Sequence, residues 1–137
     1  DWGDPKALEA SVIPEHCLEG TEGHKIVEGL VKDENRDVII PQARIFDKVT
    51  FGSHDLVDRL ECNFKYGIAS EQMGEPLEEI AICGFCTGIC VLANAILLRT
   101  AFPNTRITVL RDYCGDLTPE YHENALKQMK RLLIDIG

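Results

Sequence analysis

The residues whose type and spacing most directly suggest chemistry are the cysteines of the segment Cys83-Gly-Phe-Cys-Thr-Gly-Ile-Cys90. An apolar run precedes this segment and apolar residues at helical spacing follow it, so we expect a buried strand, a glycine turn and a helix. Cys90 then lies in the first turn of the helix, where unpaired N–H groups and the helix dipole favour a nucleophilic thiolate. The competing interpretation is a small buried side chain, which free cysteines often are. The position after a strand and a glycine turn, where α/β sheets place their chemistry, favours the nucleophile.

Cys83 and Cys86 form a C-x-x-C pair, a spacing used both for thiol redox chemistry and for metal binding. A redox pair is expected to open the helix with its first cysteine exposed, whereas Cys83 ends the predicted strand. A zinc or iron–sulfur site at these cysteines lacks a fourth ligand at motif spacing. We therefore rank redox chemistry below hydrolysis, and a metal site at the cysteines below both.

Lys48 is a further candidate, because it follows a short extended segment and precedes the turn 51–53. In a parallel sheet its cation could project from the same edge as Cys90 and stabilise a thiolate, although an ordinary surface lysine has the same signature. Asp1 and His16 are able to bind a metal, but their separation makes the signal weak, and a structural role for His16 is the alternative. The remaining histidines are interpreted as solvated residues in or beside polar helical faces: His24, His54 and His122.

The composition of the chain excludes some classes of partner and function. With 137 residues, 45% of them hydrophobic, the chain can bury a core as a single domain over 1–137. The formal charge of −9 argues against nucleic acid as a partner. No apolar run approaches the roughly 18 residues of a membrane span, so we expect no membrane partner. The six cysteines are expected to be reduced thiols in a cytoplasm, since a chain of this kind needs no disulfide framework.

The elements that must position the candidate residues alternate along the chain. Strands are predicted at 37–41, 80–82 and 106–110, and helices after Thr21, after Ser53, from about residue 89, and from Pro119, which Thr118 caps. The last helix is expected to present Leu132 and Leu133 on its apolar face. Alternating strands and helices predict an α/β fold with a mostly parallel sheet.

The segment from Cys83 to Ala95 resembles the nucleophile motif of the isochorismatase-like cysteine hydrolases, a superfamily that includes nicotinamidases. Three other segments are similar in the same order: Asp1-Trp2 to an Asp-Trp-His loop, His16-Cys-Leu-Glu-Gly-Thr21 to a His-Cys-x-x-Gly-Thr segment, and Asp47 to Ser53 to the lysine segment. The resemblance implies a Rossmann-like three-layer α/β/α fold. It also implies Cys90 as the nucleophile, Lys48 as the triad lysine, the backbone N–H groups of Cys86 and Cys90 as the oxyanion hole, and a cis peptide between Phe85 and Cys86.

Two departures from the family pattern limit what the resemblance implies. Asp1 and His16 match metal ligands of the family, but Gly3 replaces a ligating histidine, so we expect no required cofactor and weak zinc binding or none. The family's catalytic aspartate follows a first strand that would precede Asp1. We therefore expect the chain to be N-terminally incomplete, without that strand and without a residue that inherits the aspartate's role.

The sequence thus predicts a hydrolase that cleaves the C–N bond of a small amide through a thioester on Cys90. Its partner would be the small-molecule substrate, and we expect a cytoplasmic homo-oligomer. Two alternatives remain open. One is a thiol-disulfide oxidoreductase that uses Cys83 and Cys86, and the other is a non-catalytic isochorismatase-like protein with a binding or assembly role.

Overall fold

A computed structural model describes residues 13–14, 16–26, 46–64 and 77–137 of the chain. The predicted strand at 37–41, the later part of the helix expected after Thr21, and the candidate residue Asp1 lie outside these ranges. The chain forms two compact units, Asp1–Thr50 and Phe51–Gly137, and each is described by itself.

The first unit contains one short 3-10 helix, η2 (Glu22–His24), among its described residues. A longer helix capped by Thr21 was expected here. The Thr21 hydroxyl instead donates to the carbonyl of Leu18 at 2.6 Å, so it does not cap the following turn. Ile26, just after η2, is exposed. The helix is thus reduced to a single turn in the described part of this segment.

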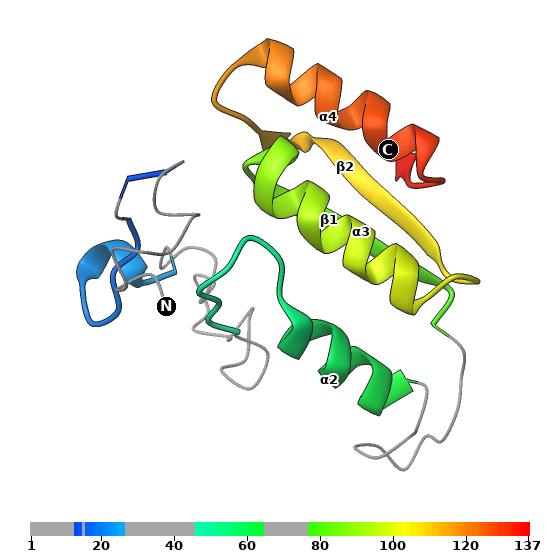
Figure 1. The fold of residues 1–137 in the computed structure, drawn as a ribbon, viewed down its shortest axis with the longest axis horizontal. Helices are drawn as coiled ribbons and strands as arrows, with labels where there is room; N and C mark the ends of the chain where they lie inside the picture. Colours follow the sequence, from blue (N-terminus) through cyan, green and yellow to red (C-terminus); the bar gives the residue numbers. More distant parts are fainter. Residues whose placement is uncertain (1–12, 15, 27–45, 65–76) are drawn as a thin grey trace, which may run out of the picture. The chain divides into compact units, whose positions relative to one another are not determined.

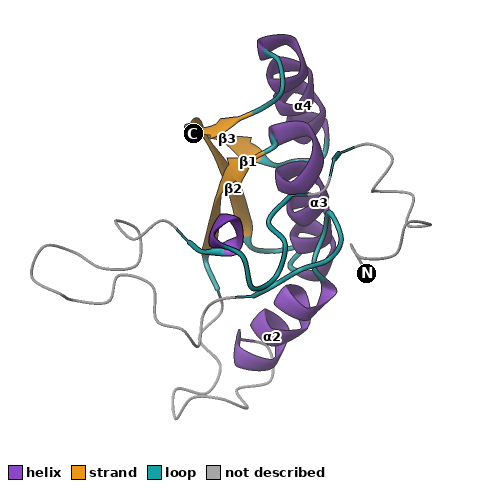
Figure 2. Ribbon diagram, turned by 90° about the vertical axis from the view of Figure 1, so that its left-hand side faces the viewer, coloured by secondary structure: helices purple, strands orange, loops and turns teal. Residues whose placement is uncertain are grey.

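The second unit is built on a parallel sheet of three strands in the order β1 (Glu79–Phe85), β2 (Arg106–Gly115) and β3 (Asp135–Ile136). The β1–β2 connection carries a π-helical turn η4 (Thr87–Val91) and helix α3 (Leu92–Ala101), and the β2–β3 connection carries α4 (Pro119–Arg131). Figures 1 and 2 show α3 and α4 on one face of the sheet. Right-handed crossovers that advance in one direction require this arrangement. The predicted α/β fold with a parallel sheet is confirmed.

Two helices of the second unit start at the capping residues expected from the sequence. The Ser53 hydroxyl accepts the N–H of Leu56 at 3.2 Å at the start of α2 (His54–Phe64). Thr118 accepts the N–H of Tyr121 at 3.2 Å, and Pro119 occupies the first turn of α4. These bonds satisfy N–H groups that a helix start leaves without a partner.

The end of α4 differs from the sequence prediction. The helix stops at Arg131, and Leu133 adopts a positive φ of 59°. Leu132 and Leu133, predicted to face the core, are exposed, and Ile134 is buried in their place. This turn lets the chain reverse into β3, whose two residues pair with Thr108 and Val109 of β2.

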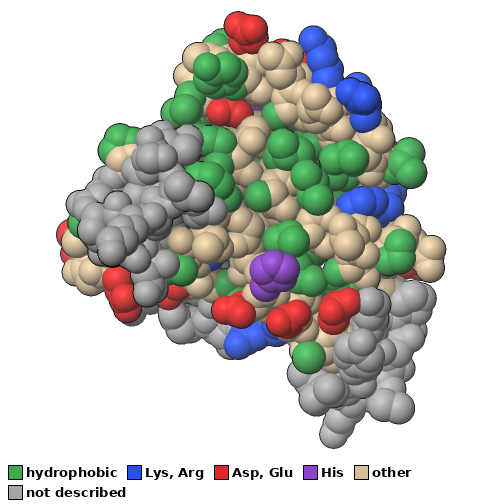
Figure 3. All heavy atoms as spheres, viewed as in Figure 1, with side chains coloured by type: hydrophobic (Ala, Val, Ile, Leu, Met, Phe, Trp, Pro, Cys, Tyr) green, Lys and Arg blue, Asp and Glu red, His purple; other side chains and the backbone are tan. Residues whose placement is uncertain are grey.

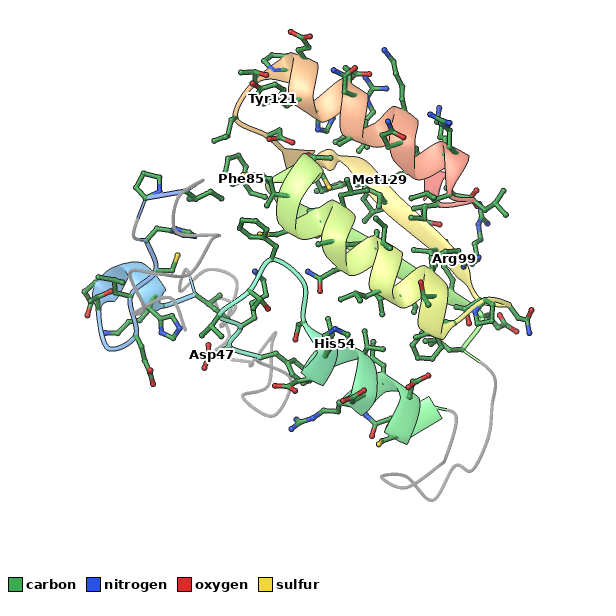
Figure 4. All side chains as sticks on the ribbon, viewed as in Figure 1. Asp47, His54, Phe85, Arg99, Tyr121 and Met129 are labelled. Atoms are coloured by element: carbon green, nitrogen blue, oxygen red, sulfur yellow. The ribbon has the colours of Figure 1, made fainter. Side chains whose placement is uncertain are left out.

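The core lies between the sheet and its helices. Its buried side chains are Val57, Val91, Ala95, Leu98, Phe102, Ile107, Val109, Ala125, Leu126, Met129 and Ile134. Arg99 closes the α3–β2 turn (Figure 4), where its guanidinium donates to the carbonyls of Pro103 and Thr105. Figure 3 shows acidic side chains over α2 and basic ones along α4, which ends with Lys130 and Arg131. None of the helices in the described ranges is long and apolar enough to cross a membrane.

Candidate functional site

The candidate nucleophile lies in a tight turn at the carboxyl end of β1. The peptide bond between Phe85 and Cys86 is cis, at the position that the resemblance indicated. Just before it, Gly84 has a φ of +140°, which side chains with a Cβ rarely adopt. The carbonyl of Cys86 then accepts the N–H of Ile89 at 3.2 Å and that of Val91 at 3.1 Å. The second bond spans five residues, so this turn is π-helical, and Cys90 lies in it directly after the strand.

The two cysteines of this turn have different environments. Cys86 is 4% exposed, whereas Cys90 is half-buried. Burial raises the pKa of the Cys86 thiol above its ordinary value, and the negative charges of Asp116 and of an ionised Cys90 raise it further. Cys86 therefore stays a neutral thiol, and Cys90 is the more accessible sulfur of the turn.

Asn94 links the turn to the segment that precedes α2. Its amide nitrogen donates to the carbonyl of Cys90 at 2.8 Å and to that of Phe51 at 3.1 Å. Its amide oxygen accepts the N–H of Ser53 at 3.0 Å. The three bonds use both ends of one side chain and fix α3 against residues 51–53. Sequence reasoning missed this role, although an asparagine within an apolar helix is a signal that could have indicated it.

Thr87 joins the turn to β2 and α4 through a completely buried hydroxyl. The oxygen Oγ1 lies 2.9 Å from the carbonyl of Gly115 and 2.8 Å from Nδ1 of His122. A carbonyl can only accept, so the single hydroxyl proton goes to Gly115 and Nδ1 of His122 carries the proton that Thr87 accepts. His122 was interpreted as solvated. That interpretation is wrong, because α4 packs against η4 and leaves the ring half-buried.

Asp116 makes a second link from the β2–α4 connection to the turn. Its Oδ2 accepts the N–H of Gly88 at 2.6 Å, and its Oδ1 accepts the N–H of Leu117 at 2.8 Å. A Cβ on residue 88 would lie 3.0 Å from this Oδ2 and 3.5 Å from the Cβ of Ala125. Glycine at position 88 therefore allows both the Asp116 carboxylate and α4 to lie close to the backbone of the turn. Neither Thr87 nor Asp116 was singled out from the sequence, because their partners lie on β2 and α4.

The other candidate residues lie in the first unit or outside the described ranges. Lys48 is exposed, and its Nζ donates to the carbonyl of Thr50 at 3.0 Å. His16 is exposed as well, and its Nδ1 donates to the carbonyl of Pro14 at 2.8 Å. The described residues contain no group of three His, Cys, Asp or Glu side chains arranged to hold a metal, and Gly3 offers no ligating side chain. Asp1, the other predicted ligand, lies outside the described ranges, so the expectation of weak zinc binding or none stays a prediction.

The two cysteines of the C-x-x-C pair lie in different environments. The cysteines of the described ranges, Cys83 and Cys86 among them, are free thiols. Cys83 lies within β1, whereas Cys86 follows it. Cys83 is exposed and Cys86 is buried, and the redox alternative stays a prediction.

Comparisons with known proteins agree on one family. The isochorismatase domain family matches residues 3–136. Among solved structures, the nicotinamidase/pyrazinamidase of Bacillus subtilis is 21% identical with a TM-score of 0.66, and the match covers 100% of this chain and 69% of that one. The pyrazinamidase/nicotinamidase of Streptococcus mutans UA159 is 25% identical with a TM-score of 0.68, covering 100% and 70%. The pyrazinamidase of Pyrococcus horikoshii, solved with zinc, is 29% identical with a TM-score of 0.61, covering 90% and 62%. No curated protein sequence matches the chain significantly.

Proposed function

The chain belongs to the isochorismatase family, and we propose that it is a cysteine hydrolase that cleaves the C–N bond of a small amide through a thioester on Cys90. The observation that carries the proposal is the position of Cys90, half-buried in the π-helical turn directly after β1. Cys86 is buried, which leaves Cys90 as the more accessible sulfur of this turn. The similar proteins from Streptococcus mutans and Pyrococcus horikoshii are a pyrazinamidase/nicotinamidase and a pyrazinamidase, which supports nicotinamide and pyrazinamide as the first substrates to test.

In the proposed reaction, the Cys90 thiol gives up its proton to solvent water, and the thiolate sulfur attacks the amide carbonyl carbon. The carbonyl oxygen becomes an oxyanion, which the backbone N–H groups of Cys86 and Cys90 stabilise. The C–N bond then breaks, the nitrogen takes up the proton, and ammonia or an amine leaves a thioester behind. Water attacks the thioester, the C–S bond breaks, and the acid and the free thiol are released.

Lys48 has the role of the cation in this proposal. A lysine ammonium near a cysteine favours the thiolate, because the opposite charge stabilises the ionised form. The assignment rests on the resemblance of the segment from Asp47 to Ser53 to the lysine segment of the family. Lys48→Met should therefore lower the rate of Cys90 alkylation at neutral pH, and Lys25→Met, from an exposed lysine paired with Glu22, is the matched control.

The proposal is tested by hydrolysis of a panel of small amides by the full protein, with mass detection of an acyl group on Cys90. Cys90→Ala should abolish turnover and the acyl adduct, whereas Cys83→Ala, from an exposed cysteine on β1, should retain both. Turnover that survives in Cys90→Ala, or an acyl group trapped on another cysteine, would contradict the proposal.

A cytoplasmic location and a homo-oligomeric state stay predictions from the sequence. Light scattering of the purified protein measures the oligomeric state directly, and a monomer would show that expectation to be wrong.

A further inference from the structure

The turn η4 (Thr87–Val91), which carries Cys90 and is called the nucleophile turn below, accepts support from one carboxylate outside it, that of Asp116. Asp116 lies at the end of β2 and accepts the N–H of Gly88 at 2.6 Å, while its other oxygen accepts the N–H of Leu117 at 2.8 Å. Both carboxylate oxygens therefore accept a hydrogen bond, one from the turn and one from the residue that follows Asp116. The second bond fixes the carboxylate, so that the first can fix the turn.

The absence of a side chain at Gly88 makes room for the carboxylate of Asp116. A Cβ at position 88 would come within 3.0 Å of Asp116 Oδ2, a contact tighter than side chains normally make. Only glycine lets the carboxylate reach the N–H group without a shift. Core packing alone would not require a charged group here, since an apolar side chain at 116 could also cover a glycine.

Gly88 lies between Cys86 and Cys90, whose backbone N–H groups form the proposed oxyanion hole. The bond to Asp116 restrains the peptide group of Gly88, two residues from each cysteine, and the Cys86 carbonyl accepts the N–H groups of Ile89 and Val91, which flank Cys90. An oxyanion hole works only when its donors already point at the position that the oxyanion will occupy.

We propose that Asp116 is a positioning residue of the nucleophile turn, which holds the Gly88 N–H so that the N–H groups of Cys86 and Cys90 keep their catalytic direction. The proposal rests on the proposed hydrolase function. Asp116 touches no substrate atom in this assignment and acts through the backbone of η4. Its carboxylate also contributes to the raised pKa of Cys86, which keeps that neighbour neutral.

Kinetics of Asp116→Ala measures the positioning effect. We expect kcat to fall about 10- to 100-fold with little change in KM, because misplaced donors affect the transition state more than the bound substrate. Asp116→Asn should be intermediate, since an amide oxygen can replace only one of the two acceptor oxygens. Alkylation of Cys90 by iodoacetamide should keep nearly its wild-type rate, because that reaction forms no oxyanion. Glu120→Ala, from an exposed acid in the first turn of α4, is the control and should leave kcat unchanged.

A double-mutant cycle tests the pairing of Asp116 with Gly88. Gly88→Ala should lower kcat in the wild-type background, where its Cβ displaces the carboxylate, and should have little further effect in Asp116→Ala. Additive effects would overturn the proposal. So would a change confined to KM, or a loss of Cys90 alkylation in parallel with kcat.

Hydrogen exchange at the Gly88 amide gives a readout that needs no turnover. Asp116→Ala should accelerate exchange at this amide at a temperature where the variant stays folded, and Asp116→Asn should accelerate it less. Unchanged exchange in Asp116→Ala would overturn the proposal. If the wild-type protein hydrolyses no amide, the proposed function fails, and the exchange measurement still decides whether Asp116 restrains the turn.

Discussion

Replacing Thr87 by valine should destabilise the protein by about 2–4 kcal/mol, although the two side chains have nearly the same shape. The hydroxyl is completely buried and makes two hydrogen bonds, to the Gly115 carbonyl at 2.9 Å and with His122 Nδ1 at 2.8 Å. Valine leaves the carbonyl and the ring N–H without their partner, and each buried group left unpaired costs about 1–3 kcal/mol. We take the lower part of that range, about 1–2 kcal/mol for each group, because both residues are half-buried.

Thr87→Ser is the matched control, because it keeps the hydroxyl and loses only a methyl group. Its expected cost is about 1 kcal/mol. In urea denaturation with a slope near 2 kcal/mol per molar, the valine variant should shift the midpoint down by roughly 1–2 M and the serine variant by about 0.5 M. A serine variant that is less stable than the valine variant would refute this reasoning, since it would show that packing outweighs the two hydrogen bonds.

Two further predictions concern stability. Gly52→Ala should destabilise the protein by about 1 kcal/mol in thermal or urea unfolding, since the added Cβ would lie 2.7 Å from Leu97 Cδ1. Gly23→Ala is the control and should be nearly neutral, because its Cβ would have no contact closer than 3.8 Å. Equal effects of the two substitutions would contradict this prediction. Stability should also fall as pH rises above 9.0. Burial is the main cause that raises the pKa of Cys86 and of Cys114 above this ordinary value in the folded protein. The thiols of the unfolded chain therefore ionise at a lower pH, which favours unfolding. Replacing both cysteines by alanine should reduce the difference between the urea midpoints measured below and above that pH. An unchanged difference would show that other groups cause the loss of stability.

Local sequence signals predicted the parts of the fold that local chemistry determines. Ser53 and Thr118 cap the helices expected of them, and the position of Cys90 after β1 follows from an apolar run and a glycine turn. In contrast, β3 was missed. Its two residues form a strand only because β2 is available to pair with them, and the preceding Leu132 and Leu133 continue the helical spacing.

The polar links of the site could not be predicted for a similar reason. The bonds of Thr87 to His122 and of Gly88 to Asp116 join residues that are brought together only when α4 packs against η4. A histidine on a polar helical face and an aspartate after a strand have many surface interpretations, and periodicity does not distinguish among them. Their roles depend on tertiary contacts, which a single sequence does not encode locally.

The Asn94 amide has a consequence for how the protein opens. Because this one side chain bonds to Phe51, Ser53 and the Cys90 carbonyl, the entry to α2 and the nucleophile turn should behave as one cooperative unit in sub-global unfolding. Fraying of α2 from its first turn would then loosen the Asn94 side chain, which also bonds to the Cys90 carbonyl. Native-state exchange should therefore give similar opening free energies to the amides around Ser53 and to those of the turn, and Asn94→Ala should separate the two.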